Sequence, residues 1–211
     1  MVRAVKWSTL FFAGFIVVTQ QVITNGPFIA LDARIANAGR TDFPSWIDFI
    51  LMRIDDLGLR GLTGTALLIA AMYIAKRFKT WRPLNLAILS LIALNLTVGL
   101  SKLLIGRTKP TLNVDLIYAG GLSYPSGHAS NALLSWGVLA YLIYRYAHVN
   151  RYRGRLASTG VALISLSVCV VSLFRNTHWL SDLVGGLFIG AALLVMVIAV
   201  DRFVPSNSQR S

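Results

Sequence analysis

The sequence predicts an all-α, polytopic membrane protein with six transmembrane helices and short interfacial helices between the first and second spans. Composition and the length of the apolar segments predict this fold class. Apolar residues make up 55% of the 211-residue chain and charged residues only 13%. Several apolar segments approach the ~20 residues that a helix needs to cross a hydrocarbon core about 30 Å thick. At this length we expect a single domain covering residues 1–211.

The six predicted spans follow the apolar segments in order. The first has the basic start and apolar core of a signal peptide, but it is long and no clear small-x-small cleavage site follows it, which favours an uncleaved span. The spans are Trp7 to Thr24, Gly61 to Ala75, Pro83 to Ile105, Pro125 to Ala147, Leu156 to Leu173 and His178 to Val200. Gly186 and Gly190 in the sixth form a Gly-x3-Gly face, which is typical of helix packing within a chain or between chains.

The segment from Asn25 to Arg60 mixes charged residues, such as Arg40 and Asp42, with apolar residues at helical spacing. This pattern predicts short amphipathic helices at the membrane surface. A solvated loop with hydrophobic anchors is the alternative. The apolar positions are Phe28, Leu31, Ile35, Trp46, Phe49, Ile50 and Ile54.

The distribution of basic residues predicts the orientation. With the N-terminus inside, twelve of the 20 lysines and arginines are cytoplasmic and only Asp201 opposes them. The net charge of +12 therefore follows the positive-inside pattern of a protein in a lipid bilayer and not a nucleic-acid-binding face. We expect a multi-pass protein of the cell membrane with both termini cytoplasmic. The twelve are Arg3, Lys6, Lys76, Arg77, Lys79, Arg82, Arg145, Arg151, Arg153, Arg155, Arg202 and Arg210.

Three predicted helix ends bring polar residues to the extracytoplasmic face. Pro125-Ser126-Gly127-His128 opens the fourth span, with proline expected at the first helical position. The free N–H groups of Ser126 and Gly127, together with the helix dipole, predict an anion site that a ligand can approach closely at glycine. The third span ends with Lys102, Arg107 and Lys109, and the sixth begins with His178 and Asp182.

His178 and Asp182 are spaced to share one helix face. An aspartate that accepts a hydrogen bond from one imidazole nitrogen leaves the other free to act as a nucleophile. The alternative is an interfacial histidine beside an unrelated aspartate, but the second histidine and the basic residues on the same face favour the catalytic pair. Snorkelling toward headgroups is the alternative for the basic residues, although Lys102 would be costly facing lipid. His148, in the cytoplasmic loop, is assigned no role.

These three segments resemble the signature of the type 2 phosphatidic acid phosphatase superfamily, whose soluble relatives include the vanadium haloperoxidases. The signature reads Lys-x6-Arg-Pro, Pro-Ser-Gly-His and Ser-Arg-x5-His-x3-Asp, and it matches Lys102 to Pro110, Pro125 to His128 and the region ending in His178 and Asp182. The resemblance implies a six-helix core with an outward-facing site. It also implies a nucleophilic His178 oriented by Asp182, and His128 as the acid and base. The short chain favours a bacterial member.

The chain departs from the signature at two positions. Lys109 replaces the arginine of the first motif, which keeps the charge but loses the bidentate fork, and Arg107 could compensate. Ser172 stands where the third motif has its arginine, with Val171 at the serine position, and Arg175 is the candidate replacement.

The predicted function is hydrolysis of a lipid phosphate or diphosphate through a phosphohistidine, without a metal or another cofactor. The predicted phosphate ligands are Lys102, Arg107, Lys109, Ser126, Gly127 and Arg175. The resemblance suggests phosphatidylglycerol phosphate, phosphatidic acid or a polyprenyl diphosphate as the substrate. Phosphotransfer between lipids, and non-catalytic binding or transport of a lipid phosphate, are the alternatives. The sequence leaves the oligomeric state open.

Overall fold

The structure is a computed structural model that describes residues 1–38, 43–112, 114–147 and 150–204. Within these ranges the chain forms helices and no strands, as predicted. Arg40, Asp42, His148 and Arg210 lie outside the described residues. The elements are α1 (Val2–Ile23), α2 (Pro27–Asn37), α3 (Ser45–Asp55), η1 (Asp56–Gly58), α4 (Arg60–Arg77), α5 (Arg82–Ile105), η2 (Pro110–Leu112), α6 (Gly127–Tyr146), α7 (Arg151–Phe174) and α8 (Leu180–Phe203).

Six long helices coincide with the six predicted spans: α1 and α4 to α8. Within the described ranges, four helical segments are long and apolar enough to cross a membrane, namely Val2–Ile23, Arg82–Leu112, Arg151–Phe174 and Leu180–Phe203. The pair Ser45–Gly58 and Arg60–Arg77 qualifies when taken together and is bent by 53°. α6 is not among these segments and is more polar than they are. Its first turns hold Ser130 and Asn131, which the surrounding helices bury.

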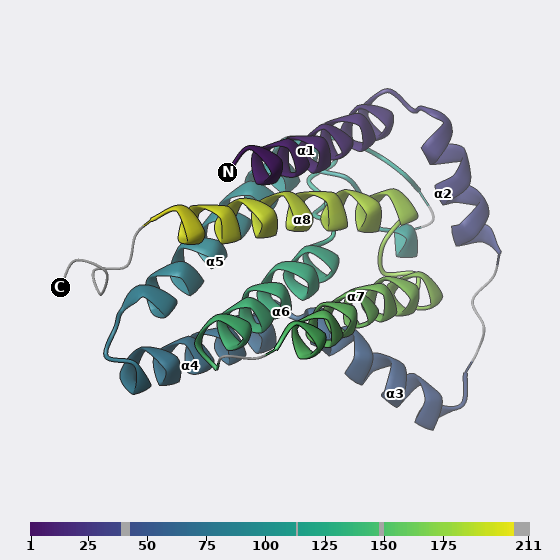
Figure 1. Ribbon diagram of the computed structural model, residues 1–211. Coiled ribbons are helices and arrows are strands. Elements are labelled where there is room, and N and C mark those ends of the chain that lie inside the picture. The colour runs from purple at the N-terminus through teal and green to yellow at the C-terminus, as the bar shows by residue number, and fades with distance from the viewer. Residues whose placement is uncertain (39–42, 113, 148–149, 205–211) are drawn as a thin grey trace.

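α6 is the centre of the bundle (Figure 1). It packs against α4, α5, α7 and α8, and α1 covers the other side of α8. Leu134 and Val138 of α6 are fully buried and belong to one apolar cluster with Leu67, Leu94 and Ile189 from three neighbouring helices. This core fixes the relative positions of the helix ends that hold the polar residues.

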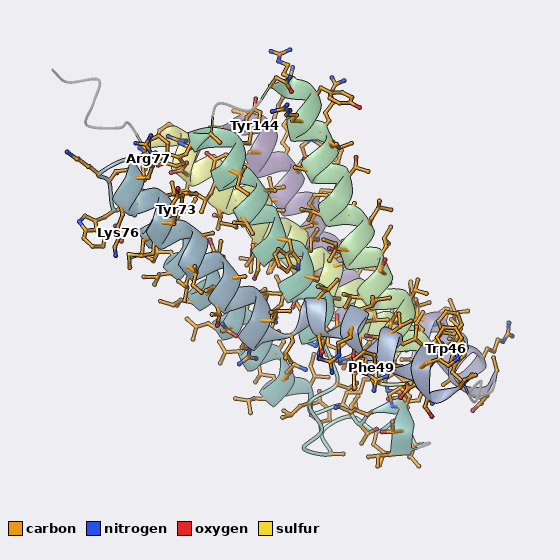
Figure 2. The ribbon with its side chains drawn as sticks, turned by 90° about the horizontal axis from the view of Figure 1, so that it is seen from below. Trp46, Phe49, Tyr73, Lys76, Arg77 and Tyr144 are labelled. Carbon is orange, nitrogen blue, oxygen red and sulfur yellow. The ribbon has the colours of Figure 1, made fainter. Side chains whose placement is uncertain are left out.

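α2 and α3 lie at one end of the bundle, where α2 contacts α1 and α8, and α3 contacts α7 (Figure 1). The prediction of helices in this segment is confirmed, and their position at a membrane surface stays a prediction. The exposed side chains of Trp46 and Phe49 point away from the bundle on α3 (Figure 2). Each helix also has one buried aspartate, Asp32 on α2 and Asp55 on α3.

The opposite end of the bundle is basic. The N-terminal end of α1 and the C-terminal end of α8 both lie there (Figure 1), as do Lys76 and Arg77 of α4 (Figure 2). Asp201 is buried at this end, where it accepts hydrogen bonds from Arg82 Nε at 2.7 Å and Arg145 Nη1 at 2.6 Å. Among the residues that the structure describes, the one aspartate at this end is therefore neutralised by two arginines.

The Gly-x3-Gly face of α8 packs against α6 within the chain. A Cβ atom at Gly186 would lie 2.6 Å from the carbonyl oxygen of Ser126, and one at Gly190 would lie 3.1 Å from that of Ser130. The helix backbones would have to move to admit a Cβ at Gly186, and a Cβ at Gly190 would be tight. The two glycines therefore let the N-terminal ends of α6 and α8 come into contact.

Gly186→Val should lower stability and activity together, because the new side chain would overlap the α6 backbone. Overpacking of this kind typically costs ~1–3 kcal/mol. Thermal unfolding of the purified protein in detergent measures the effect. Gly160→Ala on α7 is the control, since a Cβ there meets nothing within 4 Å. Equal unfolding temperatures for the two variants would contradict the packing.

Candidate functional site

The structure brings the two predicted histidines together at the end of the bundle that α2 and α3 cover. His128 lies in the first turn of α6. His178 lies just before Trp179, the N-cap of α8, and so stands outside the helix that it was predicted to begin. Their ring centroids are 6.2 Å apart, and the ring planes are inclined by 58°. His178 is 7% exposed, and His128 is partly exposed. The imidazoles therefore face one small region that a ligand can reach from outside.

The carboxylate of Asp182 orients the His178 ring. Its Oδ2 lies 3.3 Å from His178 Nδ1 and accepts hydrogen bonds from the Ser123 hydroxyl and, at 3.1 Å, from the Trp179 amide. The carboxylate is completely buried, so these contacts fix its position. With Nδ1 directed at the carboxylate, Nε2 of His178 is the ring nitrogen available for chemistry. Ser123 is a site residue that the motifs did not indicate.

The start of α6 differs from the prediction in two details. The helix begins at Gly127 with Ser126 as N-cap, whose hydroxyl accepts a hydrogen bond from the Ala129 amide at 3.3 Å. Pro125 precedes the cap after a cis peptide bond, so its predicted place at the first helical position is wrong. The Ser126 amide donates to the Asp182 carbonyl at 2.9 Å and is not free for an anion.

Gly127 keeps the features of an anion site. In the described part of the chain, no hydrogen-bond acceptor lies in reach of its amide or of the His128 amide. A Cβ at Gly127 would meet only the Asn131 amide nitrogen, at 3.9 Å. Two unpaired N–H groups thus lie at the positive end of the helix dipole, at His128 itself and at the residue before it.

Lys102 and Lys109 bring positive charge to the same loop. The Lys102 ammonium donates to the carbonyl of Leu122 and, at 3.5 Å, to that of Ser123, just before the Pro-Ser-Gly-His segment. An ammonium has three N–H donors, so one remains for a ligand. Lys109 is exposed, and its charge interacts with those of His128 and Lys102.

Arg107 does not occupy the place of the phosphate ligand that was predicted to compensate for Lys109. It is completely buried, and each guanidinium nitrogen donates to a carboxylate: Nη1 to Asp182 at 2.8 Å, Nη2 to Asp32 at 2.7 Å, and Nε to Asp115 at 2.8 Å. Nη1 also donates to the Ser181 hydroxyl at 2.6 Å. This geometry does not fit the predicted contact with phosphate. Arg107 instead holds the aspartate that orients His178.

Asp32 connects α2 to this cluster. It accepts hydrogen bonds from the Ser181 amide at 2.9 Å, from the Ser181 hydroxyl and from Arg107. Burial raises the pKa of Asp32, and these hydrogen bonds partly oppose that shift. The motifs did not indicate Asp32 or Asp115. The signal that could have found them is the excess of aspartates on the predicted outer face, where buried basic residues need partners.

Arg175 lies on the α3 side of the site. Its Nη1 donates to Asp55 at 3.2 Å, and its Nε lies 3.7 Å from Asp48. Ser172, at the position of the missing arginine, donates to the other oxygen of Asp55 at 3.0 Å. Asp55 therefore accepts hydrogen bonds from Ser172, which replaces the motif's arginine, and from Arg175, the candidate replacement. These contacts connect α3 to the end of α7.

Asp32→Ala should destabilise the protein more than Asp32→Asn. Alanine removes the acceptor of the Ser181 amide, of the Ser181 hydroxyl and of one N–H of Arg107 Nη2, whose other bond to Asp115 remains. Each buried unsatisfied group costs ~1–3 kcal/mol. Asparagine keeps an acceptor oxygen. Chemical or thermal unfolding in detergent measures the difference. Asp48→Ala is the control, because the Asp48 side chain is 57% exposed. The role of Asp32 would be refuted by an alanine variant as stable as this control.

Comparisons with known proteins place the site region in one family. Residues 83–204, which include α5 to α8 and both histidines, match the model of the PAP2 superfamily. The match confirms the resemblance drawn from the three motifs.

A similar curated protein and a similar solved structure each cover nearly the whole chain. Phosphatidylglycerophosphatase B of Bacillus subtilis (strain 168) is 24% identical over 204 residues, which cover 94% of this chain and 97% of the relative. A crystal structure described as the first transmembrane PAP2 type phosphatidylglycerolphosphate phosphatase from Bacillus subtilis has a TM-score of 0.82 at 21% identity, with 94% and 97% of the two chains covered. The fold likeness therefore extends beyond the matched family region to α1, α2 and α3.

Proposed function

Because this chain belongs to the PAP2 superfamily, we propose that it is an integral membrane lipid phosphatase that works through a phosphohistidine. The observation that supports this best is the pair of imidazoles with ring centroids 6.2 Å apart, one of them held by a buried aspartate. A nucleophile backed by an orienting group, and opposite an acid, is the arrangement that covalent phosphoryl transfer needs.

In the first step, His178 Nε2 attacks the phosphorus atom of the lipid phosphate in line with the bond to the leaving oxygen. A nitrogen–phosphorus bond forms as the phosphorus–oxygen bond breaks. Asp182 accepts the hydrogen bond from Nδ1, which stabilises the positive charge that develops on the ring. His128, protonated at the start, donates its proton to the departing oxygen.

In the second step, the neutral His128 removes a proton from a water molecule that attacks the phosphohistidine. The nitrogen–phosphorus bond breaks, and inorganic phosphate leaves with His178 restored. One imidazole thus acts first as acid and then as base, which returns both histidines to their starting states.

Lys102, Lys109 and the amides of Gly127 and His128 are the proposed phosphate ligands, with the Ser126 hydroxyl as a further donor. Phosphoryl transfer depends mainly on such positioning and on neutralising the charge of the phosphate oxygens. Arg107 and Arg175 are engaged by carboxylates. We assign Arg107 to holding Asp182, and Arg175 to holding Asp55 beside the site.

We propose six spans, with both termini cytoplasmic and the histidines on the extracytoplasmic face. The N-terminal end of α1 and the C-terminal end of α8 lie at one end of the bundle, as an even number of spans requires (Figure 1). That end is the basic one, which the positive-inside rule assigns to the cytoplasm. α2 and α3, at the histidine end, are proposed to lie at the outer membrane surface.

The proposed substrate is phosphatidylglycerol phosphate, the substrate named for the solved relative with the same fold. Purified protein should release inorganic phosphate from this lipid faster than from phosphatidic acid or a polyprenyl diphosphate. Release should continue in EDTA, because the scheme uses only side chains, and loss of activity that Mg²⁺ restores would overturn it. A phosphorylated acceptor lipid would identify a transferase, and bound lipid without phosphate release would identify a binder or transporter.

The roles of the two histidines should separate in a labelling experiment with phosphatidylglycerol phosphate that carries the radiolabel in its terminal phosphate. His178→Ala removes the nucleophile, so neither labelled protein nor product should form. His128→Asn should lower turnover by ~10²–10⁴, the usual contribution of an acid–base group. Because His128 serves both steps, an acid-labile label should form slowly on the protein and then also decay slowly, since water is no longer activated. Label on the His178→Ala variant would exclude His178 as the nucleophile.

A further inference from the structure

A groove between α7 and α8 opens at the basic end of the bundle, away from the histidines. α7 packs against α6 but contacts α8 only sparsely, and Figure 1 shows the two helices diverging from the turn that joins them. A cavity of about 730 Å³ lies between α6, α7 and α8. Its volume is in the range of small-molecule binding sites.

The walls of this cavity are mostly apolar, with three arginines at its end. Leu194 and Ile198 of α8 face Val161 and Ala162 of α7 across the cavity. On α8 the lining extends from Leu194 to Arg202, about 12 Å of helix. This is close to the depth of one leaflet, half of a hydrocarbon core about 30 Å thick. The shape and depth therefore suit the acyl chain of a lipid whose headgroup lies at the arginines.

The three arginines of the lining are Arg151, Arg155 and Arg202. In the described part of the chain, no carboxylate forms an ion pair with any of them. Asp201, the aspartate next to Arg202, is already bound by Arg82 and Arg145. The guanidinium groups are thus available to an anion, and they bind phosphate groups with bidentate geometry.

A second cavity, of about 350 Å³, extends the groove toward the histidine end. It shares Leu133 and Ala162 with the first and is lined by apolar residues that include Phe188 and Leu187. The apolar path therefore continues beyond the arginine end, where a longer chain can follow it.

We propose that this groove is a binding site for one anionic phospholipid of the leaflet at the basic end of the bundle. Its headgroup phosphate binds Arg151, Arg155 and Arg202, and one acyl chain lies between α7 and α8. Charge complementarity selects an anionic phospholipid over a zwitterionic one, because basic clusters between membrane helices favour anionic headgroups. The site is separate from the histidines, and the inference does not depend on the proposed phosphatase activity.

Native mass spectrometry of the detergent-purified protein tests the proposal with phosphatidylserine and phosphatidylcholine as competing probes. Neither has a phosphate monoester, so the histidine site has no substrate in this experiment. The wild type should retain one phosphatidylserine molecule in preference to phosphatidylcholine. Replacing Arg151, Arg155 and Arg202 together by glutamine should weaken this binding by roughly 100-fold, from the typical attraction of one basic residue to an anionic surface.

The matched control replaces Arg3, Arg77 and Arg153 by glutamine, which removes three arginines that do not line the groove. This control should bind phosphatidylserine like the wild type. Equal weakening in both triple variants would show general surface attraction and overturn the site.

Ala162→Phe tests the chain-binding part without changing charge. Ala162 is exposed and lines both cavities, so the phenyl ring of phenylalanine should block the groove and lower retention of phosphatidylserine. Unchanged retention would overturn the proposal. So would a wild-type dimer that Ala162→Phe converts to a monomer, because the groove would then be an interface between copies of the chain.

Discussion

The close contact between the N-terminal ends of α6 and α8 is the constraint on which the site depends. The Ser126 amide donates to the Asp182 carbonyl, so the cap of one helix is bonded directly to the first turn of the other. Gly186 permits this approach because any Cβ there would overlap the Ser126 carbonyl. As a result, His128 and His178 come from helices far apart in the sequence and still face one ligand-sized region.

A buried arginine, Arg107, fixes the aspartates that lie behind His178. Arg107 contacts aspartates from α2, from the loop after α5 and from α8, and all its guanidinium nitrogens are engaged. Burying one guanidinium among three carboxylates is costly unless every polar atom finds a partner. Ser181 accepts a hydrogen bond from Arg107 through its hydroxyl and donates one to Asp32 through its amide, which helps to meet that requirement. The cluster connects α2 to Asp182, so the position of α2 affects the aspartate that orients His178.

The two ends of the bundle use charge differently. At the histidine end, aspartates neutralise Arg107 and Arg175, while Lys102 and Lys109 remain for an anionic ligand. At the opposite end, a single aspartate is bound by two arginines, and further arginines line an apolar groove. Both ends therefore offer positive charge to a ligand with a phosphate group.

The sequence by itself determined the helical class, the six long helices and the residues of the two-histidine pair, because hydropathy and short motifs depend on residues near one another in the chain. It could not assign Arg107, whose spacing from Lys102 suits a phosphate ligand as well as a structural ion pair. Only the tertiary structure decided that assignment, and it also revealed Asp32, Asp115 and Ser123. Asp32 and Ser123 contact residues that are distant in the sequence, and such contacts form only when packing brings the segments together. Asp115 is close to Arg107 in the sequence, but no motif indicates that the two side chains meet.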